Sequence, residues 1–420
     1  MGADDAHEVG RESLTARRAH LLRTRVLAAV MAGVAAIALL AANTAAAMVR
    51  TGPSGLAFYH PPRSLPDGHG TLIWARNAGG LVPLANAAST KLVLYTSLAP
   101  GGKPTAVSGS VSVPKGKPPK GGWPVISYAH GTTGIADVCA PSRNHEGDPA
   151  QAYISYVDPQ LNAWLAAGYA VVRTDYEGLG TPAPHAYLIG ATEGRSVLDI
   201  VRAARELDPS IGKRFLISGH SQGGHAALFA AGEANGYVPD LALRGTVSYA
   251  PASHLKEQAS LLPALTSPSS LTALATLIVK GATIASAPSA PIYASALLSD
   301  QVLAYYPLVN QLCLSDLSAP SRLGGIAPST MVRSGADTTA LFKVLARQNP
   351  AVTTTAPVLV AQGDADTTVF KQFTDLLVNQ LNGAGDNVTY SVYPGVNHGG
   401  IVAASEPEVL AFYKSKLPPH

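Results

Sequence analysis

A serine, an aspartate and a histidine in the second half of the chain have the residue types and spacing for acyl transfer. Ser221 lies in GHSQG, between an apolar stretch, 214–218, and an alanine-rich stretch, 226–231. A GxSxG sequence between a strand and a helix is typical of a nucleophile elbow, where Gly219 and Gly223 give the serine room. A chance GxSxG in a chain with 40 glycines would not account for this setting. We therefore interpret Ser221 as a nucleophile.

A serine hydroxyl needs a base and an orienting acid, and candidates for both follow Ser221 in the chain. His398 stands in GVNHGG after an alternating strand, and it is the predicted base. An apolar strand ends at Gly363, and the next loop holds Asp366, the predicted acid, and Asp364, which is the alternative or a turn residue. The order serine, aspartate, histidine is that of α/β hydrolases, not that of chymotrypsin or subtilisin.

Acyl transfer also needs N–H groups that stabilise an oxyanion. The backbone amide of Gln222 is the first predicted donor, because it follows the nucleophile at the start of a helix. The second is expected in HGTTG, which follows a buried strand. We assign it to Thr132, with Gly131 or Thr133 as alternatives, and we expect His130 to bond the loop backbone.

Further strings give the chain a resemblance to a known family. They are FYHPP at 58–62, HGTTG, CAPS at 139–142, TDYEGLGTP at 174–182, GHSQGGHAA, QGDAD and NHGG. Together they make the chain similar to the secretory lipases, the triacylglycerol lipase group of fungi and actinomycetes in the α/β hydrolase superfamily. The resemblance implies a triad of Ser221, Asp366 and His398 and an oxyanion hole at Thr132 and Gln222. It leaves the acyl chain length open.

The elements that must position these residues alternate between strands and helices, which predicts a mostly parallel sheet with helices on both faces, as in the α/β hydrolase fold. The expected strands lie near 91–98, 106–113, 124–129, 169–174, 214–218, 245–249, 357–362 and 388–393, and the expected helices near 191–207, 222–234 and 369–382. In TDYEGLG, Asp175 and Glu177 are expected to bond the loop beside the elbow. The predicted core comprises 49–251 and 351–420.

The interval 252–350 is apolar, helical in spacing and interrupted by prolines, so we interpret it as a cap inserted into the core. A cap there would cover Ser221, exclude water and present apolar side chains to an acyl chain. Most of these side chains are expected only to pack the cap against the core. We also expect the cap to move on contact with a lipid interface.

The first 48 residues have the composition of a targeting segment. Basic residues, among them Arg17, Arg18 and Arg25, precede an apolar run from Val26 to Ala42, and cleavage after Ala47 would complete a secretory signal. An uncleaved anchor is the alternative, because the run reaches the ~20 residues that cross a bilayer. The twin-arginine pattern is a poor match. Either way, the catalytic part is expected outside the cytoplasm.

The two cysteines, Cys139 and Cys313, are predicted to form a disulfide, since export removes the reducing environment. Such a link would restrain the unfolded chain by ~4 to 5 kcal/mol. The resemblance implies that the cysteine of CAPS ties the core to the cap; two buried thiols are the alternative. Five further histidines show no spacing of metal ligands, so we expect no metal and no cofactor. They are His145, His185, His220, His225 and His254.

The composition fits an exported enzyme with one large core, because 47% of the 420 residues are hydrophobic. A net charge of +3 with 14% charged residues favours neither nucleic acid nor an acidic ligand. We therefore expect an exported serine lipase or carboxylesterase that acts on lipid or small ester substrates and contacts lipid interfaces transiently. An exported acyltransferase with the same triad is the alternative. A noncatalytic lipid-binding protein is a third reading.

Overall fold

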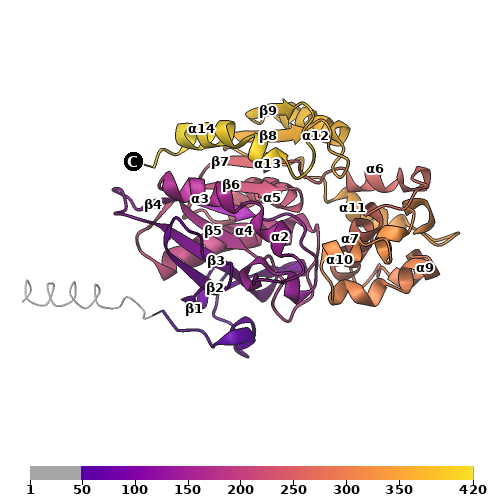
Figure 1. Ribbon diagram of the computed structural model, residues 1–420, viewed down its shortest axis with the longest axis horizontal. Helices are drawn as coiled ribbons and strands as arrows, with labels where there is room; N and C mark the ends of the chain where they lie inside the picture. The colour runs from indigo at the N-terminus through magenta and orange to yellow at the C-terminus, as the bar shows by residue number, and fades with distance from the viewer. Residues whose placement is uncertain (1–48, 420) are drawn as a thin grey trace, which may run out of the picture. The chain divides into compact units, whose positions relative to one another are not determined.

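The centre of the fold is a nine-stranded sheet in the order β1-β2-β3-β5-β4-β6-β7-β8-β9 (Figure 1). The computed structural model describes residues 49–419, so the predicted leader at 1–48 lies outside the described residues. Strands β5, β4, β6, β7, β8 and β9 run parallel, and β1 to β3 add an antiparallel edge. The bounds are β1 Leu72–Asn77, β2 Ala87–Ala99, β3 Lys103–Pro114, β4 Trp123–Ala129, β5 Ala170–Thr174, β6 Ile211–His220, β7 Ala242–Tyr249, β8 Val358–Gly363 and β9 Val388–Tyr393.

Helices cover both faces of this sheet, as the alternation along β4 shows. Val125 and Ala129 point into a core shared with α4 (Gly190–Leu207) and α5 (Gln222–Tyr237). Ile126 and Tyr128 point into the opposite core, beside α3, α13 and α14. The bounds of these three helices are α3 Asp158–Ala166, α13 Ile401–Ala404 and α14 Glu406–Lys416, and the core also contains α2 Gln151–Ser155 and α12 Lys371–Gly383. The expected α/β hydrolase architecture, a mostly parallel sheet between helical layers, is thus confirmed.

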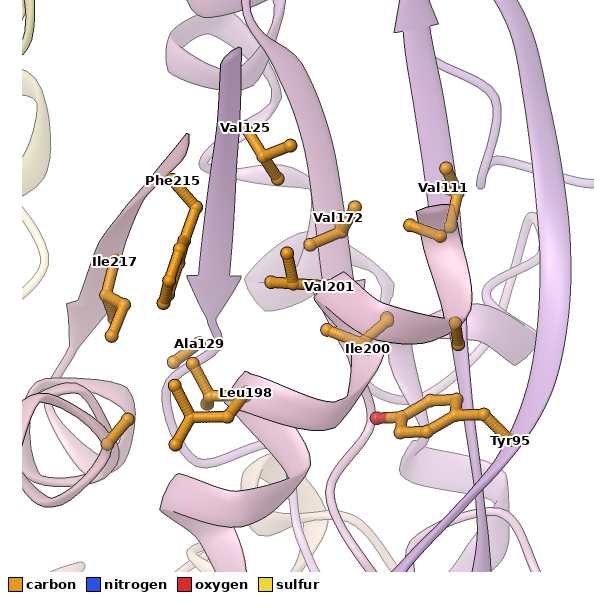
Figure 2. Close-up of a cluster of buried hydrophobic side chains, with 14 of the residues drawn as sticks. Tyr95, Val111, Val125, Ala129, Val172, Leu198, Ile200, Val201, Phe215 and Ile217 are labelled. Carbon is orange, nitrogen blue, oxygen red and sulfur yellow. The ribbon is translucent and has the colours of Figure 1, made fainter. Parts of the chain in front are cut away.

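The first of these two cores is built from hydrophobic side chains of neighbouring strands that meet helices α4 and α5, and Figure 2 shows part of it. Figure 2 shows Val125, Val172, Phe215 and Ile217 of the strands beside Leu198, Ile200 and Val201 of α4. Strands β4 and β5 are buried along their whole length, as expected for parallel strands that helices cover on both faces. Packing on both faces holds these strands in place, and with them the ends from which the loops of the site begin.

The chain between β7 and β8 is helical, and Figure 1 shows it in orange, gathered beside the sheet. Its helices are α6 Leu255–Ala259, α7 Leu271–Ala285, α8 Ala294–Leu297, α9 Asp300–Leu303, α10 Leu314–Leu317 and α11 Thr339–Ala346, with short 3-10 turns between them. They share a hydrophobic cluster of their own, which Tyr187 and Leu188 join from the core. We refer to residues 252–350 as the cap. No helix within residues 49–419 is both long and apolar enough to cross a membrane.

All eight expected strands are present, and the structure adds elements that the sequence did not reveal. In the core, these are strand β1 at the sheet edge and helices α2, α3, α13 and α14. Helix α3 has a proline in its first turn, where the missing N–H would have no acceptor within the helix, and it buries Trp164 completely. A helix this short depends largely on such packing for its stability.

Candidate active site

Ser221 occupies the turn between β6 and α5, with φ of 60° and ψ of −116°. A positive φ is costly for a residue with a side chain, and such strain is typical of nucleophile elbows. The flanking glycines are sterically required. A Cβ on Gly219 would lie 2.0 Å from the carbonyl oxygen of Gly223, and one on Gly223 would lie 1.9 Å from that of Ala129. The turn is therefore pressed against the end of β4.

The structure brings Ser221, His398 and Asp366 together in one hydrogen-bonded row. The Ser221 Oγ lies 2.9 Å from His398 Nε2, and His398 Nδ1 lies 2.7 Å from Asp366 Oδ2. The other carboxylate oxygen of Asp366 accepts the amides of Thr368 and Val369, both at 2.8 Å. A carboxylate held in this way accepts the Nδ1 proton of His398, which leaves Nε2 free to accept the serine proton.

Asp364, the alternative acid, lies on the same loop but has another partner. Its Oδ1 accepts the backbone amide of Gly395 at 2.6 Å, so it joins the loop after β8 to the loop after β9. Its side chain makes no hydrogen bond to His398 among the described residues. Asp364 therefore holds the two loops that carry Asp366 and His398 against each other.

The two predicted oxyanion residues are buried on either side of the elbow. Gln222 is the first residue of α5, where N–H groups have no acceptor within the helix. Thr132 lies in the loop after β4, and its Oγ1 is 2.7 Å from the hydroxyl of Tyr187. The alternatives Gly131 and Thr133 belong to the same buried loop. Tyr187 was not found from the sequence, because an isolated tyrosine carries no motif.

Two histidines next to the proposed machinery are held neutral. Burial lowers the pKa of His130 to about 4, and the Nδ1 of its neutral ring donates to the carbonyl of Gly131 at 2.7 Å, a bond to the loop backbone as expected. Burial also lowers the pKa of His220 well below its usual value. The Nε2 of His220 donates to the carbonyl of His398 at 2.9 Å, so its Nδ1 accepts the hydroxyl proton of Tyr156 at 2.6 Å. His220 therefore holds the loop that carries the predicted base.

The two acidic residues of TDYEGLG bond loops beside the elbow, as expected. Asp175 accepts the hydroxyl of Ser108 at 2.6 Å and the backbone amide of Ser142 at 2.9 Å. Glu177 accepts a bond from His185 at 3.1 Å, and both side chains are buried. These contacts stabilise the chain around the loop of Thr132 and give neither acid a direct approach to Ser221.

A cavity of about 560 Å³ opens at Ser221. Its floor comes from the core, and most of the remaining wall comes from the cap. The cap side chains include Leu255, Leu262, Leu271, Leu274, Ile278, Val279, Leu341, Phe342 and Leu345. Such a wall suits an extended hydrocarbon chain rather than a polar ligand.

The cap is joined to the core beside the proposed oxyanion loop. Cys139 and Cys313 form the predicted disulfide, and the amide of Leu314 donates to the carbonyl of Thr133 at 2.8 Å. Within residues 49–419, no group of three side chains is arranged to bind a metal ion. The disulfide and the hydrogen bond from Leu314 therefore connect the chain around Thr132 to the cap.

Comparison with known sequences supports the resemblance that the motifs indicated. Residues 151–281 match the sequence model of the secretory lipase family. The chain is 29% identical over 197 residues to lipase A of Moesziomyces aphidis, and the aligned region covers 45% of this chain and 41% of that protein. A probable inactive lipase of Mycobacterium tuberculosis is 30% identical over 218 residues, covering 48% of this chain and 46% of that protein. The chain thus spans less than half the length of each curated relative.

Comparison with solved structures extends the likeness to most of the chain. The closed state of Candida antarctica lipase A superposes with a TM-score of 0.70 and 21% identity, over 87% of this chain and 84% of that one. At this identity the match establishes the fold alone. The suspected relationship to secretory lipases is confirmed by the family match and by the curated lipases.

Proposed function

From its match to the secretory lipases, we propose that this protein is an exported serine lipase or carboxylesterase that hydrolyses carboxylic esters of lipids. Two features support the proposal together. Ser221, His398 and Asp366 form a hydrogen-bonded row, and the serine opens into an apolar cavity. A nucleophile supported by a base fits acyl transfer, and the cavity fits a hydrocarbon acyl group.

In the first half of the proposed reaction, the Ser221 hydroxyl attacks the ester carbonyl while His398 Nε2 takes its proton. Asp366 holds the imidazole in the tautomer that can accept this proton and stabilises the resulting imidazolium. The carbonyl oxygen becomes an oxyanion, which the amides of Gln222 and Thr132 stabilise by hydrogen bonds. The imidazolium then protonates the alcohol as it leaves, so that an acyl ester of Ser221 remains.

In the second half, water takes the place of the alcohol. His398 removes a proton from the water, which attacks the acyl ester through a second oxyanion, and Ser221 regains its proton as the acid leaves. The acyl chain lies among the cap side chains in this proposal. The cap then both excludes bulk water and selects the substrate by its apolar part.

The single observation that carries the proposal is the 2.9 Å contact between Ser221 Oγ and His398 Nε2 at the mouth of the cavity. A noncatalytic lipid-binding protein would have no need of this contact. The relative described as a probable inactive lipase makes a direct test necessary.

The test is a panel of esters of graded acyl length, measured below their solubility limits with the wild-type protein and Ser221→Ala. We expect turnover by the wild type and loss of at least about a thousandfold in Ser221→Ala, since removal of a triad member costs several orders of magnitude. A fluorophosphonate should label the wild type at Ser221 and leave the variant unlabelled. Failure of the wild type to hydrolyse any ester and to be labelled would refute the proposal.

Ser127→Ala is the matched control, because Ser127 is also a buried serine but does not line the cavity. Its hydroxyl donates to the carbonyl of Val197 at 2.7 Å. It should retain turnover and labelling. Adding glycerol to the same assay separates hydrolysis from acyl transfer. Ester formation that exceeds release of free acid would replace the hydrolase with the acyltransferase.

Export is part of the proposal and rests on three supports. The first 48 residues resemble a secretory signal, the matching family is described as secretory, and Cys139 and Cys313 form a disulfide. Disulfides persist chiefly outside the reducing cytosol. Fractionation of producing cells, with N-terminal sequencing of the exported protein, should find the catalytic part outside the cytoplasm and the chain beginning after Ala47. An intact N-terminus in the membrane fraction would favour the anchor.

A further inference from the structure

A fully buried carboxylate, Glu193, lies behind the proposed oxyanion hole and takes no part in the triad. It belongs to the first turn of α4 and has no solvent-exposed surface. Its Oε1 accepts two bonds, from the side-chain amide of Gln222 at 2.7 Å and from the backbone amide of Leu188 at 2.9 Å. Its Oε2 lies 3.2 Å from His225 Nδ1. One side chain thus connects α4, α5 and the segment before α4.

The partners of Glu193 keep it ionised despite its burial. Desolvation disfavours the charged carboxylate, but His225 and His185 and the bond from Gln222 together hold the pKa of Glu193 below its usual value. His225 Nε2 lies 3.0 Å from the carbonyl of Gln348, so it donates its proton there. The ring of His225 therefore has an acceptor on each side. A buried carboxylate such as Glu193 is costly unless its acceptor oxygens are used.

The first connection leads to Gln222, the predicted donor that follows the nucleophile. The Nε2 of its side chain donates to Glu193 at 2.7 Å and lies 3.1 Å from His185 Nε2. His185 is fixed in turn by Glu177. The side chain of Gln222 cannot rotate without breaking these bonds, so they fix the orientation of the residue whose backbone amide faces the oxyanion in our proposal.

The second connection leads to the loop of Thr132. Leu188, which donates its amide to Glu193, has a φ of 55°, a conformation that a leucine seldom adopts without support. Its neighbour Tyr187 lies 2.7 Å by its hydroxyl from Thr132 Oγ1. Tyr187 and Leu188 also line the cavity at Ser221. The bond from Leu188 to Glu193 therefore fixes the position of residues 187–188, and Tyr187 in turn contacts Thr132, the second predicted donor.

We propose that Glu193 is the positioning residue of the oxyanion hole, one carboxylate oxygen of which orients both predicted donors, Gln222 directly and Thr132 through Leu188 and Tyr187. This inference rests on the proposed function, because it concerns the same acyl-transfer site. It goes beyond that function in assigning a role to a residue that touches neither substrate nor triad. A merely structural Glu193 would affect stability and leave the chemical step unchanged.

The test compares Glu193→Ala with Glu193→Gln in kcat and KM on the best ester of the panel. Glu193→Ala should lower kcat by about 10- to 100-fold, less than or equal to the loss of one oxyanion donor, with KM changed less than about threefold. Glu193→Gln should stay within about threefold of the wild type. The reason is that both donors meet on one oxygen, which glutamine retains, while its NH2 can donate to His225 Nδ1.

Binding of a trifluoromethyl ketone adds a readout that a purely structural role would not change. This compound forms a tetrahedral adduct with Ser221, whose oxyanion occupies the hole. Its inhibition constant should rise in Glu193→Ala by the factor by which kcat/KM falls. The inhibition constant of a carboxylate product, which carries no tetrahedral oxyanion, should stay constant.

Asp199→Ala is the matched control, since Asp199 is another fully buried carboxylate of α4, bonded to His69 at 2.6 Å and Tyr237 at 2.9 Å. It should lose stability and keep kcat. If Glu193→Ala does not fold, Gln222→Ala takes its place, because it removes the anchored side chain and keeps the backbone amide. It should also lower kcat with little change in KM.

The outcomes separate this inference from the proposed function. A wild type that hydrolyses no ester refutes both. A wild type that hydrolyses esters, with kcat unchanged in Glu193→Ala or in its substitute Gln222→Ala, refutes the inference alone. In the double variant Glu193→Ala with Gln222→Ala, the two losses should be less than additive, because both remove the same anchor. Full additivity would show that Glu193 does not act through Gln222.

Discussion

Replacing Gly223 with alanine tests how closely the elbow must approach the oxyanion loop. A Cβ at this position would lie 1.9 Å from the carbonyl oxygen of Ala129 and 2.8 Å from that of His130. Real Cβ atoms keep at least 3.0 Å from such atoms, so the elbow and the end of β4 must separate by about 1 Å. Neither obstacle is a side-chain end that can rotate away. The loop of Thr132 begins directly after these residues.

The expected loss follows from that displacement. A misplacement of about 1 Å in a catalytic arrangement costs about a hundredfold in rate, and overpacking a well-packed site costs about 1 to 3 kcal/mol of stability. We therefore expect Gly223→Ala to lower kcat about a hundredfold and to lower the free energy of unfolding by about 1 to 3 kcal/mol. The assay is kcat on a short soluble ester, with urea unfolding of the same preparation.

Gly236→Ala is the control on the same helix, α5. No atom lies within 4 Å of a Cβ at this exposed position, and alanine is the better helix former. It should keep kcat and gain up to about 1 kcal/mol of stability. The reasoning is wrong if Gly223→Ala retains kcat within about threefold, because the elbow would then tolerate a separation from β4.

Three further predictions concern the cavity and two buried groups. Below the solubility limit, kcat/KM should rise about fourfold for each added acyl methylene until the cavity is full, since burying one is worth about 0.8 kcal/mol; a flat profile would contradict an acyl-binding role. His220→Phe should lower kcat about tenfold with little change in KM, because the loop of His398 loses one hydrogen bond; an equal rise in KM would argue against that reason. Burial raises the pKa of Glu406 to about 7, so its ionisation destabilises the fold as pH rises from about 4.5 to 7. In urea unfolding, the free energy of unfolding of Glu406→Gln should increase relative to that of the wild type by about 1 to 2 kcal/mol between pH 5 and 8, a range kept low because the carboxyl is only half-buried. A difference between the two proteins that does not change with pH would contradict this prediction.

The chemistry of the site could be predicted from the sequence because it depends on short local patterns. Ser221 stands in a strand-turn-helix motif, Asp366 follows an apolar strand, and His398 follows an alternating one. In a parallel sheet, the carboxyl ends of neighbouring strands meet at one edge, which brings residues 177 positions apart within hydrogen-bonding distance. The central strands could be predicted because burial on both faces of the sheet makes them rich in hydrophobic residues.

The supporting contacts could not be predicted in this way. Glu193 looks like any glutamate of an amphipathic helix, and only the packing of α4 on α5 shows that it lies on the buried face. The role of His220 depends on a carbonyl 178 residues away in the chain. Strand β1 escaped notice because its last residues, Arg76 and Asn77, are polar and partly exposed at a sheet edge. Each of these features arises from contacts between distant segments.

The disulfide divides the proposed triad between two covalent parts of the chain. Cys139 and Cys313 are 174 positions apart, and the link between them closes a covalent ring that contains Ser221, Gln222 and most of the cap. Asp366 and His398 lie outside it, in the loops that follow the C-terminal strands β8 and β9. A ring of this size restrains the unfolded chain by about 5 kcal/mol, but that restraint does not extend to the C-terminal tail. Detachment of the tail would therefore remove the predicted base and acid, together with the pocket side chains Leu341, Phe342 and Leu345, from a nucleophile that stays within the ring. Loss of activity on heating should then precede loss of the bulk fold.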